Sequence, residues 1–131
     1  MTSIITINPD ELAPLPGPAH VIVAEGGRTI YVSGQTGVDT EGKVVGADHR
    51  SQSVQALKNL EIALAAAGAS MADVVRMGIY IADYSEEALG ALVEAAIEVT
   101  GTIPSATSTL LGVASLWQSD LLVEIDAVAV V

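Results

Sequence analysis

The chain of 131 residues contains no cysteine and no phenylalanine, and it has only two histidines. Without cysteine it can form no disulfide, use no thiolate nucleophile and build no sulfur-ligated metal site. His20 and His49 belong to no histidine pair with metal-ligand spacing, and the acidic residues do not follow the calcium-loop pattern. The sequence therefore predicts no metal site.

Basic residues are also scarce, since five lysines and arginines stand against sixteen acids and give a net charge of −11. Nucleic acids and anionic membrane surfaces are bound through clustered basic side chains. The five basic residues of this chain are scattered singly: Arg28, Lys43, Arg50, Lys58 and Arg76. We therefore expect no nucleic-acid partner and no membrane association.

Long apolar runs are missing as well. The longest charge-free apolar run, Ile62–Ala69, is far shorter than the roughly 20 residues that span a bilayer. Met1–Pro9 has neither a basic segment nor a long apolar stretch, so no secretion signal is expected. The length suits one domain over residues 1–131, and we expect it to be cytoplasmic.

The hydrophobic residues that are present are mostly small. They make up 50% of the chain, with only one tryptophan and three tyrosines among them. Small aliphatic side chains pack well but fill volume poorly, so part of the apolar surface is expected to be buried between subunits.

The first part of the chain favours strands. Ser3–Asn8, His20–Glu25 and Arg28–Ser33 are rich in β-branched residues. Gly26-Gly27 separates the last two runs, and a glycine pair supplies the positive φ angles of a tight turn. We therefore expect these two strands to form a hairpin, and Gly37–Val45 to form a second, smaller one.

The second part alternates between helical and strand periods. The stripe of His49–Ala67 indicates a helix, and so does the apolar stripe that follows the N-cap residue Ser85. Strands are expected between and after them, with Val75, Met77, Ile79 and Ile81 on one face of the first: Val74–Ile81, Ser105–Val113 and Leu121–Val130. The order predicts an α+β fold, a mixed, mainly antiparallel sheet with two helices packed on one face.

Several separate motifs resemble those of one known family. They are Ser33-Gly34-Gln35, Asp39–Gly46, Gln52 with Gln55–Leu60, Ala65–Ser70, Asp73–Val75, Tyr80–Asp83 and Val123–Ala129. In this order and spacing they closely resemble the Rid (reactive intermediate deaminase, YjgF) family, from about Gly17 to Val130. The resemblance implies a chorismate-mutase-like fold and a homotrimer with small-molecule clefts between subunits. For archetypal members it also implies hydrolysis of enamines and imines such as 2-aminoacrylate to 2-keto acids and ammonia, without a cofactor.

Glu124 matches the family's glutamate that positions the attacking water. Hydrolysis of a C=N bond needs a water held by a base near the carbon. Glu124 and Asp126 lie two residues apart on an expected strand, so they share a face at a spacing of about 7 Å. Burial and mutual repulsion would raise the pKa of one of them. The alternative is that both carboxylates face water or make structural hydrogen bonds.

Ser33 matches the serine of the family's S-G-Q segment, which lies in the cleft. Its hydroxyl would donate to a substrate carboxylate, and Gly34 would let the backbone approach the ligand. The alternative is a serine at a strand end, satisfied by local hydrogen bonds.

The chain departs from the family at a tyrosine. The family's Gly-Pro-Tyr motif is Gly17-Pro18-Ala19-His20 here, so either Ala19 or His20 takes the tyrosine position. In the cleft, His20 would hydrogen-bond the substrate or carry a proton near neutral pH. A histidine at the start of a strand is otherwise a surface residue.

The second departure is an arginine that clamps the substrate carboxylate in archetypal deaminases. Either Ala106 or Ser108 takes its position, and neither is charged. Losing a hydrogen bond to a charged group costs about 1.5–3 kcal/mol. Neutral hydroxyls could line the pocket instead, those of Ser105, Thr107, Ser108 and Thr109.

Two functions remain open from the sequence. The first is an enzyme that hydrolyses a small imine or enamine, with Glu124 holding the water. The second is a non-catalytic trimer that binds a small metabolite, which the missing arginine and tyrosine favour. A purely structural role has no particular support, and the charge of −11 argues against the endoribonuclease activity sometimes attributed to this family.

Overall fold

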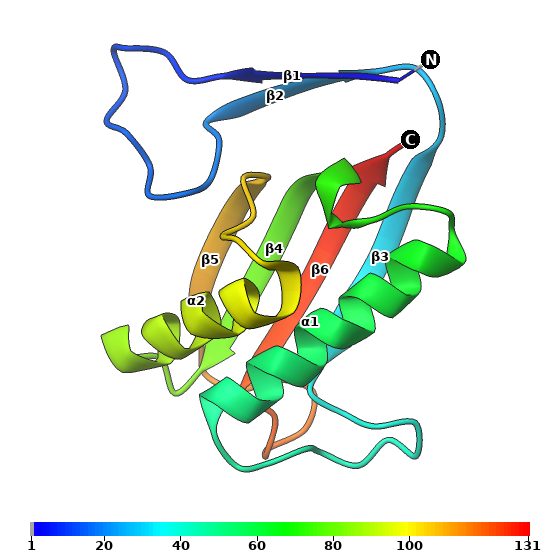
Figure 1. Cartoon of the computed structure of the whole chain (residues 1–131). Coiled ribbons are helices and arrows are strands. Elements are labelled where there is room, and N and C mark those ends of the chain that lie inside the picture. The colour runs from blue at the N-terminus through cyan, green and yellow to red at the C-terminus, as the bar shows by residue number, and fades with distance from the viewer. Residues whose placement is uncertain (1) are drawn as a thin grey trace.

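The computed structural model of the chain describes residues 2–131. Strands β3, β6, β4 and β5 form one sheet in that order, antiparallel except for the parallel β4–β5 pair. Both helices cover one face of this sheet (Figure 1), which confirms the predicted α+β architecture. The elements are β1 (Ser3–Ile7), β2 (Val21–Glu25), β3 (Thr29–Thr36), α1 (His49–Ala66), a 3₁₀ turn (Met71–Asp73), β4 (Val74–Ala82), α2 (Glu86–Thr100), β5 (Thr107–Val113) and β6 (Val123–Val130).

Local signals fix where the helices begin and end. The Asp48 carboxylate accepts the backbone N–H of Ser51 at 2.8 Å and caps α1. Ser85 caps α2 in the same way, accepting from Ala88 at 3.0 Å, and Gly101 ends it with a φ of 85°. Within residues 2–131, neither helix is long and apolar enough to cross a membrane.

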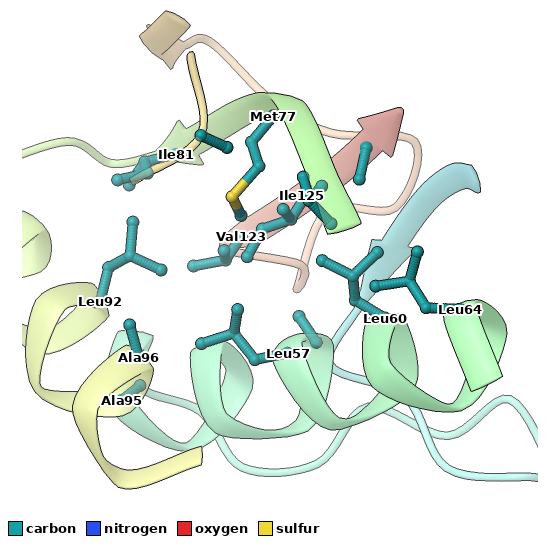
Figure 2. Packing of buried hydrophobic residues seen from close by; sticks show 14 of the residues in the cluster. Leu57, Leu60, Leu64, Met77, Ile81, Leu92, Ala95, Ala96, Val123 and Ile125 are labelled. Carbon is teal, nitrogen blue, oxygen red and sulfur yellow. The ribbon is translucent and has the colours of Figure 1, made fainter. Parts of the chain in front are cut away.

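The core lies between the helices and the sheet and consists of aliphatic side chains (Figure 2). Large residues of α1 meet the inward-facing residues of β4 and β6, while alanines of α2 let that helix approach. Each fully buried large aliphatic side chain contributes about 1.5–3 kcal/mol. The labelled members are Leu57, Leu60, Leu64, Met77, Ile81, Leu92, Ala95, Ala96, Val123 and Ile125.

Strand β4 differs in one detail from the predicted alternation. The pairing of β4 with β6 shifts register between Val74 and Arg76. The irregularity turns Val74 into the core, where it is 5% exposed, and Val75 is not part of the core cluster. Met77 and Ile81 keep their predicted places in the core.

The predicted hairpin across Gly26-Gly27 is wrong, although both glycines have the expected positive φ. β2 pairs with β1 instead, and this two-stranded ribbon lies across one end of the main sheet (Figure 1). Arg28 and Val131 exchange backbone hydrogen bonds, with the Val131 N–H donating at 3.0 Å, so the chain after the glycines joins the end of β6. A Cβ on Gly27 would overlap the Val131 carbonyl, which requires glycine there. The smaller hairpin expected at Gly37–Val45 is present as a single bridge between Val38 and Val44.

Gln52 of α1 ties together the loops that lead into β6. Its side chain is fully buried, and its Nε2 donates to the carbonyl oxygens of Asp120 (2.9 Å) and Gly46 (3.2 Å). Its Oε1 accepts the backbone N–H of Leu122 at 2.7 Å. This amide therefore sets where β6 enters the sheet.

We expect Gln52→Leu to lower the free energy of unfolding by about 2 kcal/mol, because the Leu122 N–H loses its partner. Urea denaturation measures the change. Gln55→Leu is the matched control, since Gln55 lies on the same helix and makes one side-chain bond, to Asn59. Equal losses from the two variants would contradict the role given to Gln52.

Candidate functional site

The sheet face that turns away from the helices carries polar side chains. On β6, Val123 and Ile125 are fully buried against the helices, so Glu124 and Asp126 point to the other side. We call this side the open face. It is formed by Ser33 and Gly34 of β3, Arg76, Gly78 and Tyr80 of β4, Thr109 of β5, and Glu124 and Asp126 of β6.

Asp126 is held in place by β4. Its Oδ1 accepts the backbone N–H of Gly78, and its Oδ2 accepts the Tyr80 hydroxyl, both at 3.0 Å. The absence of a side chain at Gly78 leaves room for this arrangement, because a Cβ there would lie 2.6 Å from the carboxylate and from the tyrosine hydroxyl. The hydrogen bond to Asp126 and its negative charge raise the pKa of Tyr80. Asp126 is thus a fixed acceptor.

Glu124 lies beside an irregularity in β3. The register of β3 on β6 shifts between Val32 and Gln35, so Ser33 and Gly34 form a bulge opposite Asp126. A Cβ built on Gly34 would lie 2.7 Å from Cδ of Glu124 and would overlap its carboxylate. The absence of a side chain at Gly34 therefore provides the space that the Glu124 carboxylate occupies.

The Glu124 carboxylate differs from Asp126 in its partners. It is half-buried, and no group among residues 2–131 donates a hydrogen bond to it. Burial, and then the charge of Asp126, raise the pKa of Glu124. A desolvated carboxylate with free lone pairs and a raised pKa is suited to orient a water molecule and accept its proton.

The structure brings together some of the residues singled out in the sequence. Ser33, Gly34 and Glu124 meet at the β3 bulge, and Thr109 lies on the same face, opposite Gly78. Ser108 does not join them. It lies opposite Met77 and lines an apolar pocket of about 220 Å³ between α2 and the sheet.

His20 lies at the start of β2, on the ribbon rather than on the open face. Its Nε2 is 2.7 Å from the Ala13 carbonyl oxygen, and its backbone N–H donates to Oδ1 of Asn8 at 2.8 Å. It lines a hollow of about 400 Å³ formed by the loop that precedes it. Ala19, the other candidate for the tyrosine position, is buried, as is Ala106, the other candidate for the arginine position.

Sequence reasoning gave no role to Tyr80 and Arg76. Both alternate with Met77, which faces the helices, so the open face receives them together with Gly78. The sequence signal for these residues was their alternation with the apolar positions of this strand, which places them on the opposite face. Among residues 2–131, no three histidines or acidic residues are grouped so that they could hold a metal ion.

Comparison with known proteins supports one family. The family described as Endoribonuclease L-PSP matches residues 11–131. A RutC family protein of Pyrococcus horikoshii is 30% identical, over 91% of this chain and 92% of that protein. A 2-iminobutanoate/2-iminopropanoate deaminase of Dermatophagoides farinae is 33% identical over 57% of this chain. The aligned part spans 59% of that deaminase.

A solved structure agrees over nearly the whole chain. A Rid family protein of unknown function from Yersinia pestis superposes with a TM-score of 0.86 and 35% identity, over 98% of each chain. The chorismate-mutase-like α+β fold implied by the sequence motifs is therefore confirmed. With the family match over residues 11–131, the chain belongs to the YjgF/Rid family.

Proposed function

We propose that the protein hydrolyses a small imine or enamine to a carbonyl compound and ammonia on its open face. The observation that carries this proposal is the half-buried Glu124 carboxylate, which has a raised pKa and accepts no hydrogen bond from residues 2–131. The relative named 2-iminobutanoate/2-iminopropanoate deaminase supports the reaction class.

The reaction consumes only water. As the water oxygen bonds to the carbon of the protonated imine, Glu124 accepts one proton from the water, which gives a neutral carbinolamine. Glu124 then returns this proton to the nitrogen. The carbon–nitrogen bond breaks with its electron pair going to ammonia, and the carbonyl forms as the hydroxyl proton passes to the ammonia, which leaves as ammonium. An enamine substrate first takes a proton on carbon to become the imine. No cofactor is required for these steps.

The proposal includes a homotrimer whose subunit interfaces cover the open face. In one chain this face is uncovered and carries apolar side chains at its margins, since Tyr31 is 80% exposed and Leu111 is 48% exposed. A neighbouring subunit would exclude water and bring further donors, His20 among them, toward Ser33 and Thr109. Ser108 has no place in this cleft because it faces α2. Sedimentation velocity measures the assembly.

The test is ammonia release from imines generated in place by amino-acid and amine oxidases. Turnover above the uncatalysed rate for any imine supports the proposal. The proposal would be refuted if no imine with a small, aliphatic or aromatic side chain released ammonia above the uncatalysed rate while a family member used as positive control was active. That result would favour the alternative, a non-catalytic trimer that binds a small metabolite. The buried Ala106 supports this alternative, because it is one of the two candidates for the position of the family's arginine.

The acid limb of the pH profile should report Glu124. The ionised form of Glu124 is the active base, and its pKa is raised. As the pH is lowered, turnover should therefore begin to decline at a higher pH than it would with a glutamate of ordinary pKa. Asp126→Asn removes the repelling charge but leaves the burial, so the limb should move toward lower pH without reaching the ordinary value. Rates of wild type and variant from pH 4 to 8 measure the shift. An unmoved limb would mean that Asp126 does not act on the base.

A further inference from the structure

Among the residues from 2 to 131 that form the open face, Arg76 is the one cation. Its Nη1 donates to the Met77 carbonyl oxygen and to Oγ1 of Thr109, and both bonds are long, at 3.4 Å. No carboxylate among residues 2–131 pairs with it, although the chain has sixteen acids. Arg50, by contrast, pairs with two glutamates of α2, one of them at 2.6 Å. The guanidinium of Arg76 therefore keeps donors free for a ligand.

Arg76 and Glu124 face the same side of the sheet. The two side chains lie on neighbouring strands, β4 and β6, with Gly78 and Asp126 paired between them. The charges of both side chains also act on the Tyr80 hydroxyl, whose pKa is raised chiefly by its hydrogen bond to Asp126. The cation and the candidate base therefore lie on one face, on either side of the Gly78–Asp126 pair.

An anionic substrate could bind beside the two carboxylates of the open face only with a cation nearby. Glu124 and Asp126 repel an anion, and an imino acid such as 2-iminobutanoate carries a carboxylate. A guanidinium binds a carboxylate through two parallel hydrogen bonds, which a lysine or a hydroxyl cannot reproduce. Little is lost when Arg76 turns toward a ligand, because its present bonds are long.

We propose that Arg76, assisted by the Thr109 hydroxyl, binds the carboxylate of a 2-imino acid and makes the site selective for anionic substrates. This rests on the proposed function of the same face. Arg76 would hold the anion from β4. The position of the family's arginine, by contrast, falls on the uncharged Ala106 just before β5 or on the uncharged Ser108 of β5. Arg76 is thus a specificity-determining residue.

The first test is binding, which needs no turnover. The probes are 2-oxobutanoate and its neutral amide, 2-oxobutanamide, titrated into the assembled protein by calorimetry. Arg76→Gln should weaken the binding of 2-oxobutanoate by about 10- to 100-fold and leave the affinity for the amide unchanged. The affinity of Arg76→Lys for 2-oxobutanoate should lie between those of wild type and Arg76→Gln, and Thr109→Val should lower it about 3-fold. Arg28→Gln is the matched control, because Arg28 also makes one 3.4 Å bond to a carbonyl but lies away from the open face.

The second test is turnover of paired imines with and without a carboxylate. Arg76→Gln should raise KM for 2-iminobutanoate and spare an uncharged imine. Equal effects on both imines, no change in 2-oxobutanoate affinity, or no binding of 2-oxobutanoate by the wild type would overturn the proposal. Wild-type protein that binds the oxo acid through Arg76 but turns over no imine would refute the hydrolytic function alone. Circular dichroism and sedimentation confirm that the variant is folded and assembled.

Discussion

Glu124→Gln should lower kcat/KM for imine hydrolysis by about 10²- to 10⁴-fold, the range that removal of a general base gives. The amide keeps the shape of the side chain but cannot take a proton from water. The free energy of unfolding should not decrease. Because the pKa of Glu124 is raised in the folded state, its ionised form disfavours folding at neutral pH, and glutamine removes that cost. The gain should vanish as the pH falls below the pKa of the unfolded glutamate.

The measurement pairs ammonia release with urea denaturation of the same samples. Glu41→Gln is the control, since Glu41 carries the same carboxylate on an exposed turn, where it pairs with Lys43. That variant should match the wild type in both assays. Unchanged turnover by Glu124→Gln would show that another group holds the water.

Gly34→Ala should lower turnover by about 10²-fold although no reacting group is changed, because small displacements of a catalytic group are costly. The new methyl group would occupy the place of the Glu124 carboxylate and push it from the β3 bulge. The loss of stability should be small, since the displaced atoms are the end of a flexible side chain and Gly34 does not have a positive φ.

The control for this substitution is Gly90→Ala. Gly90 lies inside α2, is exposed, and a Cβ there meets no atom within 4 Å. Alanine should leave turnover unchanged and stabilise the protein by about 0.5–1 kcal/mol. The double variant Gly34→Ala/Glu124→Gln should be no worse than Glu124→Gln if both act through one carboxylate. Full additivity would contradict the contact.

Local patterns were enough to predict most elements and to place Glu124 and Asp126 on one face. Apolar periodicity and capping residues are properties of a few neighbouring residues, so both helices and the alternation of β6 followed from them. That alternation put Glu124 and Asp126 on one face before the sheet was known. The pairing of β2 could not be predicted in this way, because strand pairing uses backbone groups that every residue has.

The amino-acid sequence alone identifies the family, the order of the elements, the two-carboxylate pattern of β6 and the glycine at position 34. Which side chains share the open face follows only from the pairing of the strands in the folded sheet. This pairing placed Thr109 there and Ser108 behind it, because a shift of one residue along a strand reverses the face. It also placed Arg76 beside Thr109 and Val128, which are 33 and 52 positions away in the chain, since strand pairing and not sequence proximity sets that neighbourhood.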